Sequence, residues 1–108
     1  MKRVLLDHCV PRSLRQALVG CDVATAYQRG WSTLKNGALL QAAEGDGFDV
    51  LVTADKNLRY QQNLANRRIA IVELPTNSLP KLRPHFSDIA DAVQRVQSGG
   101  YLEVSLPP

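Results

Sequence analysis

The sequence predicts a small α/β protein in which helices cover both faces of a mainly parallel sheet. Short apolar segments rich in valine, leucine and isoleucine, typical of strands buried on both faces, alternate along the chain with segments of helical spacing. The chain has 108 residues, which suits a single domain, 1–108, with one core. This alternation predicts a three-layer α/β/α arrangement.

The N-terminal segment predicts a strand followed by a helix. Residues 3–6 form an apolar run that predicts the first strand. Residues 11–19 begin with a proline, which suits a first helical turn, and carry Leu14, Ala17 and Leu18 at helical spacing. Gly20 follows as a helix-ending glycine, so we expect the first helix at 11–19.

The central part of the chain predicts a strand, a helix and another strand. Residues 22–27 are apolar and β-branched enough for a second strand, and residues 48–53 (FDVLVT) predict the third. Between them, residues 38–44 (ALLQAAE) are strong helix formers, with Ser32 or Asn36 as the expected cap.

The C-terminal part predicts one more buried strand, a helix and a tail. Residues 68–74 (RIAIVEL) are apolar and β-branched, and predict the fourth strand. Apolar residues at helical spacing predict a last helix over 82–96, with Pro84 near its start. Residues 101–106 alternate with a period of two, so we expect 98–108 to form a terminal arm or an edge strand.

Two aspartates stand at the ends of predicted strands. Right-handed crossovers restrict the topology, and a strand order of 2-1-3-4 places the first strand beside the third. Asp7 and Asp55 then lie at the same edge of the sheet, near the point where the strand order reverses and where ligands of such sheets bind. Either aspartate alone is explained as a cap or a turn residue, whereas the pair suits Mg²⁺ or Mn²⁺ and phosphate chemistry.

Polar side chains around this pair are candidates for substrate binding. Lys56 supplies a point charge for a phosphate, Arg29 and Trp31 offer a guanidinium and an indole that stack on bases, and amides follow Asp55 at Asn57, Gln61 and Gln62. Asn36 lies where a helix start attracts anions. Turn chemistry and core packing explain the same residues equally well.

Composition excludes several classes of protein. No apolar run has the length of a membrane span, and no signal sequence is visible, so we expect a cytoplasmic protein without membrane contact. Two cysteines and two histidines, without CxxC spacing, disfavour a zinc site and favour free thiols. The net charge of +3 permits nucleic-acid binding without requiring it.

Four segments together resemble a known family. LLDHCVPRSLR, GW followed by LKNGALLQAA, DVLVTADKNLRYQQN and RIAIVEL, in this order, resemble small PIN-like proteins related to toxin components of bacterial toxin–antitoxin pairs. The resemblance spans residues 2–74 and implies a PIN-like fold and Mg²⁺-dependent ribonuclease activity. Asp7 and Asp55 match the family's acidic residues, while His8 stands where a glutamate is frequent and Asn36 where many members carry an acid.

The resemblance leaves two functional hypotheses open, and the sequence adds a third. The first is a ribonuclease with Asp7 and Asp55 as ligands of Mg²⁺ or Mn²⁺ and Asn36 in the catalytic site. The second is a catalytically weak or inactive module that binds RNA or an antitoxin protein, which two acids support better than strong catalysis. The third is an interaction subunit that pairs through the edge of its tail, and a homodimer also stays open.

Overall fold

The computed structural model describes residues 1–56 and 67–105, apart from the side chain of Asn36. Its elements, in chain order, are four strands, β1 to β4, with helical segments between and after them, and a last strand β5. They are β1 (Arg3–Leu6), the 3₁₀ helix η1 (Arg12–Ala17), β2 (Asp22–Thr25), α1 (Asn36–Gly45), β3 (Val50–Thr53), β4 (Ala70–Glu73), α3 (Leu79–Leu82), the 3₁₀ helix η2 (Arg83–His85), α4 (Phe86–Arg95) and β5 (Tyr101–Glu103).

Within the described residues, the strands form one five-stranded sheet in the order β2-β1-β3-β4-β5. All neighbouring strands pair in parallel, and the predicted order 2-1-3-4 is confirmed for the first four. The register places Leu6 beside both Thr25 and Val52, and Val52 beside Val72. The carboxyl ends of β2, β1, β3 and β4 therefore meet at one edge of the sheet. The tail contributes β5, which lies at the outer edge next to β4.

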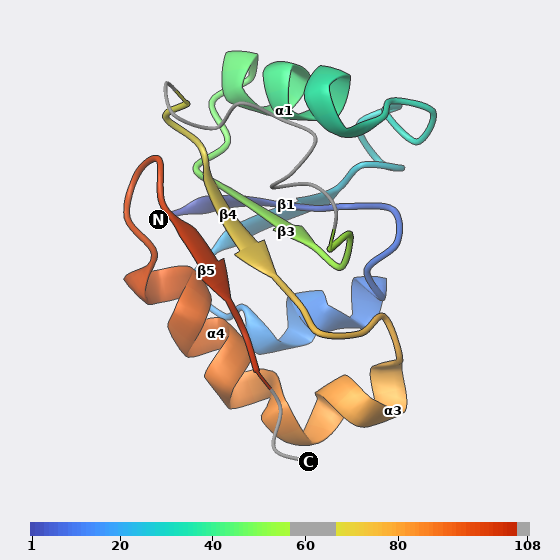
Figure 1. Cartoon of the computed structure of the whole chain (residues 1–108), viewed down its shortest axis with the longest axis vertical. Helices are drawn as coiled ribbons and strands as arrows, with labels where there is room; N and C mark the ends of the chain where they lie inside the picture. Colours follow the sequence, from blue (N-terminus) through green and yellow to red (C-terminus); the bar gives the residue numbers. More distant parts are fainter. Residues whose placement is uncertain (57–66, 106–108) are drawn as a thin grey trace.

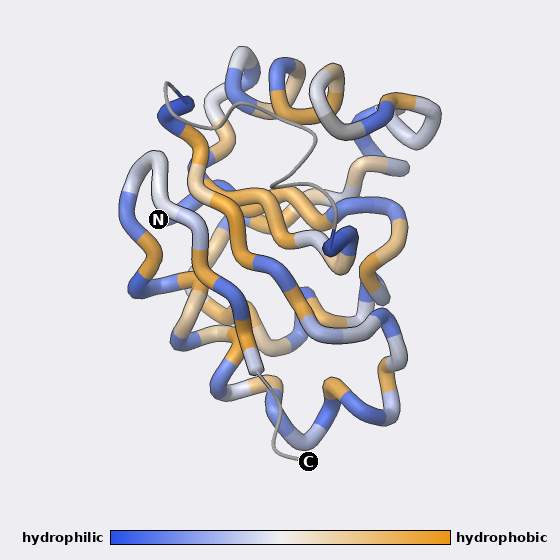
Figure 2. Tube along the Cα trace, in the orientation of Figure 1, coloured by the Kyte–Doolittle hydropathy of each residue, from blue (hydrophilic) through white to orange (hydrophobic). Residues whose placement is uncertain are grey.

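Consecutive residues of the central strands point into two separate cores. Val4, Leu6 and Val52 belong to the core that η1, α3 and α4 cover. Leu5, Leu51 and their neighbours belong to the core beneath α1. Figure 1 shows the sheet between α1 on one face and the other helices on the opposite face, and Figure 2 shows apolar residues concentrated in the strands between them. The predicted three-layer α/β arrangement is confirmed.

The first predicted helix is shorter and tighter than expected. We predicted it over 11–19, but the structure has a 3₁₀ helix over Arg12–Ala17, with Pro11 preceding it. Hydrogen bonds span three residues, from Leu14 N to Pro11 O and from Leu18 N to Arg15 O, both at 3.1 Å. Only Leu14 within it is buried, so the segment has too little apolar surface to stabilise a longer α-helix.

The last predicted helix is interrupted. We expected one helix over 82–96, whereas α3, η2 and α4 follow one another from Leu79 to Arg95. Pro84 has no N–H to donate and its ring crowds the preceding turn, so the chain tightens into a 3₁₀ turn there. The apolar row Ile89, Ala92 and Val93 is buried as predicted.

The second predicted helix begins earlier than expected and has a different cap. α1 starts at Asn36 rather than at residue 38, and its N-cap position is Lys35, without a side-chain hydrogen bond. The expected cap at Ser32 or Asn36 is therefore wrong. The first predicted strand, 3–6, matches β1, whereas β2, β3 and β4 are each two or three residues shorter than predicted. No helix in the described part is long and apolar enough to cross a membrane.

Glu44 joins the end of α1 to the start of β4. Its carboxylate accepts hydrogen bonds from the backbone N–H groups of Arg68 at 2.9 Å and Ile69 at 3.2 Å. The Ile69 N–H is the main cause that lowers the pKa of Glu44 below its ordinary value of 4.5. A carboxylate with a lowered pKa stabilises the folded state above its unfolded pKa, and this stabilisation is lost as the pH falls through the folded pKa.

We expect Glu44→Gln to remove this pH dependence. The wild-type protein should be the more stable of the two above pH 4.5, and the difference should shrink at lower pH. The difference should stay below about 1 kcal/mol, because solvent screens a largely exposed carboxylate. Urea unfolding of both proteins between acidic and neutral pH measures it, and a difference that grows on acidification would contradict the assignment.

Candidate functional site

The carboxyl edge of the sheet carries a buried aspartate directly after β1. The backbone N–H of Asp7 donates to the carbonyl of Val52 at 2.9 Å, which continues the β1–β3 pairing by one residue. Asp7 therefore lies beside Thr53, the last residue of β3, and only 5% of its surface is exposed. A carboxylate this buried is expected to be held by hydrogen bonds or charges.

Two hydrogen bonds and an ion-pair contact hold the Asp7 carboxylate. Its Oδ1 accepts from the backbone N–H of His8 at 2.7 Å and lies 2.8 Å from Nδ1 of the same residue. Its Oδ2 accepts from the Thr53 hydroxyl at 2.9 Å. An ionised carboxylate offers about four acceptor positions, and these contacts occupy most of those on Asp7.

The Thr53 hydroxyl connects the two predicted aspartates. It donates to Asp7 and accepts the backbone N–H of Asp55 at 3.1 Å. Thr53 is fully buried, so this hydroxyl is fixed by its two partners rather than by solvent. Asp55 follows β3 by two residues and is half-buried. Parallel pairing and one buried hydroxyl thus bring Asp7 and the backbone of Asp55 to one place.

Cys9 lies against the same hydroxyl. Its Sγ is 3.9 Å from Thr53 Oγ1, and both cysteines of the chain are free thiols. Burial is the main cause that raises the pKa of the Cys9 thiol above its ordinary value of 9.0, and the charge of Asp7 adds to it. Cys9 therefore stays protonated at neutral pH and is no nucleophile there.

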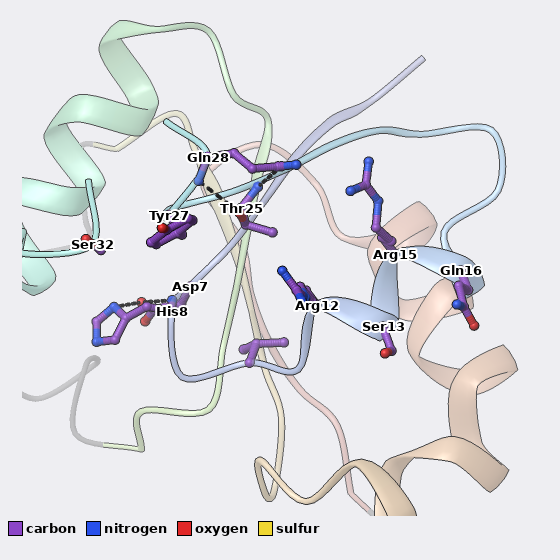
Figure 3. Close-up of a pocket in the computed structure, with 11 residues that line it drawn as sticks. Asp7, His8, Arg12, Ser13, Arg15, Gln16, Thr25, Tyr27, Gln28 and Ser32 are labelled. Carbon is purple, nitrogen blue, oxygen red and sulfur yellow. Dashed lines mark hydrogen bonds and ion pairs between the residues drawn. The ribbon is translucent and has the colours of Figure 1, made fainter. Parts of the chain in front are cut away.

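A cavity of about 580 Å³ opens beside Asp7 and His8. Its other walls come from η1 and from the turn after β2 (Figure 3). This volume lies within the range of about 300–1,000 Å³ that small-molecule sites show. The buried carboxylate is therefore next to space that a substrate can enter.

Some predicted site residues lie near this edge, and others are outside the described part. Lys56 follows Asp55 in an exposed turn. Asn36 is the first residue of α1, and its side chain lies outside the described part of the structure. Asn57, Gln61 and Gln62 also lie outside the described residues.

Arg29 and Trp31 belong to a different cluster. The Arg29 guanidinium forms an ion pair with Asp46, in the loop that leads to β3. Its Cζ also lies 5.3 Å from the centre of the Trp31 ring and 5.7 Å from that of Phe48. Trp31 contacts Phe48 edge-on, with ring centres 6.1 Å apart. The structure thus joins these two residues to each other and to the α1 core, not to Asp7.

Sequence reasoning missed a third acidic residue at this edge. Glu73, the last residue of β4, pairs in register with Thr53 and is 3% exposed. Its carboxylate accepts a hydrogen bond from the Tyr101 hydroxyl of β5. We had treated residues 68–74 as an ordinary apolar strand, although an acid near the end of such a strand is the same signal that identified Asp7. Within residues 1–56 and 67–105, no group of three or more histidine, cysteine, aspartate or glutamate side chains is arranged to hold a metal ion.

Sequence reasoning also gave too little weight to His8 and to the arginines of η1. Arg12 and Arg15 are exposed residues of η1, and both line the cavity. The contact of His8 with Asp7 gives its imidazole a defined orientation. Comparisons with protein families, with curated proteins and with solved structures found no match to this chain.

We expect Thr53→Val to destabilise the protein although it preserves the shape of the side chain. The substitution removes one hydrogen bond from the buried Asp7 carboxylate and one from the half-buried Asp55 N–H, which costs about 1–3 kcal/mol. Urea unfolding measures the loss. Thr33→Val, at an exposed threonine, is the matched control and should change stability by less than about 0.5 kcal/mol. Equal stability of the Thr53→Val and Thr33→Val proteins would show that the hydroxyl has no such role.

Proposed function

We propose that this protein is a PIN-like, metal-dependent ribonuclease, a hydrolase that cleaves phosphodiester bonds in RNA at the carboxyl edge of its sheet. The observation that carries the proposal is the Thr53 hydroxyl, which links the buried Asp7 carboxylate to the backbone of Asp55. Two strand-end aspartates so connected, of which Asp7 lines an open cavity, support an oxygen-ligand site for a cation and a phosphate.

The donor set suits Mg²⁺ or Mn²⁺ held largely by water and substrate. Mg²⁺ is usually bound through one or two carboxylates, with waters and phosphate oxygens completing its shell. Asp7 and Asp55, joined through the Thr53 hydroxyl, would supply these carboxylates. Such an ion supplies charge stabilisation at the scissile phosphate and a more acidic water.

His8 is placed to move a proton. Its Nδ1 faces the Asp7 carboxylate, so the proton of the neutral ring belongs on Nδ1, and Nε2 is left as an acceptor. The side chain is 51% exposed, so a water can reach it. In the proposed reaction, Nε2 accepts the proton of the attacking water while Asp7 keeps the imidazole oriented.

The remaining predicted residues have supporting roles in the proposal. Lys56 is exposed directly after Asp55 and would contact a phosphate as a point charge. Asn36, Asn57, Gln61 and Gln62 keep their proposed roles from the sequence, in the catalytic site and in substrate binding. Free thiols at Cys9 and Cys21 support a reducing, cytoplasmic location.

The second candidate is a PIN-like module that binds RNA or an antitoxin protein with little or no catalysis. The acid count favours it, because the described residues hold no cluster of three candidate ligands and Glu73 is engaged by Tyr101. With fewer carboxylates, a divalent ion binds more weakly. RNA retention without cleavage at saturating Mg²⁺ or Mn²⁺ distinguishes this candidate from the first.

We expect Asp7→Asn and Asp55→Asn each to reduce cleavage of a labelled single-stranded RNA by about 100-fold or more, because each removes a charge from the reacting site. Cleavage by the wild-type protein should require Mg²⁺ or Mn²⁺ and stop with EDTA. Asp88→Asn is the control, since Asp88 is an exposed carboxylate on α4. Circular dichroism verifies that each variant is folded.

Cleavage that survives both substitutions, or that continues in EDTA, would overturn the assignment. RNA binding by the wild-type protein without any cleavage would favour the second candidate.

A further inference from the structure

The cavity beside Asp7 has a positively charged wall that the proposed chemistry does not use. Arg12 and Arg15 both line it and both are exposed. In a 3₁₀ helix, residues three apart lie one above the other, about 6 Å along the axis, so η1 presents the two guanidinium groups on one face. Figure 3 shows Arg12 extending from η1 toward the turn that carries Thr25 and Gln28.

Neither arginine is engaged elsewhere. Across residues 1–56 and 67–105, Arg12 and Arg15 form no side-chain hydrogen bond or ion pair, whereas Arg3, Arg29 and Arg95 each pair with an aspartate. The one carboxylate lining the cavity, Asp7, is already held by His8 and Thr53. The wall is therefore suited to an anionic ligand with more than one charge.

An aromatic side chain stands at the opposite wall. Tyr27 lines the cavity and is 77% exposed, so its ring is available for contact with a ligand. The turn that carries it is held by a reciprocal pair of bonds: Thr25 N donates to Gln28 Oε1, and Gln28 N donates to Thr25 Oγ1, both at 3.0 Å. The ring is thus presented on a fixed turn rather than on a loose one.

We propose that this cavity binds the nucleotides of single-stranded RNA that flank the one at Asp7. Arg12 and Arg15 contact backbone phosphates, and Tyr27 stacks on an unpaired base. The inference rests on the proposed function and deepens it by assigning a subsite. Two guanidinium groups and one exposed ring that line the same cavity match a strand whose charges and aromatic faces alternate, and stacking requires bases that are not paired. An acidic peptide would pair with Arg12 and Arg15 but would not use the ring of Tyr27.

Binding of a fluorescent oligouridylate of about 12 nucleotides tests the subsite. Fluorescence anisotropy of the full chain in EDTA, over a range of salt concentrations, separates binding from cleavage. The variants are Arg12→Ala/Arg15→Ala, Tyr27→Ala and Tyr27→Phe. Arg83→Ala is the matched control, because Arg83 is an exposed arginine in the other 3₁₀ helix, η2, and does not line the cavity.

We expect the double arginine variant to bind at least about tenfold more weakly. The slope of log K against log salt should also fall by about 1.4, as two phosphate contacts on a single strand predict. Tyr27→Ala should bind about 5-fold to 150-fold more weakly, whereas Tyr27→Phe keeps the stacking face and should match the wild type. Arg83→Ala should leave both affinity and slope unchanged.

Several results would overturn the subsite. If the arginine and tyrosine variants bind and cleave RNA as well as the wild-type protein does, the subsite is wrong and the ribonuclease proposal is unaffected. Absence of any RNA binding by the wild-type protein would remove both. If an oligoglutamate peptide displaces the labelled RNA as effectively as unlabelled RNA does, and Tyr27→Ala does not change this displacement, the cavity binds a protein ligand instead.

One further result separates the two proposals. If RNA binds through the cavity and is not cleaved, the subsite is supported and the catalytic proposal fails.

Discussion

The parallel register of β1, β3 and β4 is the constraint on which the site depends. Pairing places Leu6 beside Val52 and Thr53 beside Glu73, so Asp7, the residue after β1, lies in one polar row with Thr53 and Glu73 at the carboxyl edge. Most residues of these strands are apolar and buried between two helical layers, so the register cannot shift without exposing one core. Asp7 reaches Thr53 because the backbone pairing continues one residue beyond β1.

Some side chains at this edge of the sheet are held in place by the protein, and others can contact a ligand. Thr53, buried and bonded on both sides, fixes Asp7 and the Asp55 backbone, and Asp7 in turn orients His8. The outer nitrogen of His8 and the arginines of η1 remain for a ligand. A rigid acidic centre beside a basic wall suits a phosphodiester. The arginines of the wall would contact the phosphate charges, and the fixed carboxylate would lie at the scissile bond.

The α/β class, the strand order and the meeting of Asp7 with the Asp55 backbone follow from the sequence, because apolar runs ending in aspartate fix both the strands and their polar ends. Other features could not be predicted. The 3₁₀ form of η1 depends on how little apolar surface its segment buries, and this form, not the composition, aligns Arg12 with Arg15. The place of Glu73 at the same edge as Asp7 follows only from its register with Thr53. Arg29 and Trp31 form a plausible base-binding pair in sequence, but Asp46 and Phe48 engage them in the fold.

The central claim is that Asp7 and Asp55 together hold a divalent cation, and Mn²⁺-induced line broadening in amide NMR spectra tests it most directly. We predict that substoichiometric Mn²⁺ first broadens the amide signals of Asp7, His8 and Asp55, since a paramagnetic ion acts on the nearest nuclei. In Asp7→Asn the same additions should leave these signals sharp. Broadening centred elsewhere, for example on Asp22 and Asp46 beside Arg3, or broadening unchanged in Asp7→Asn, would contradict the account.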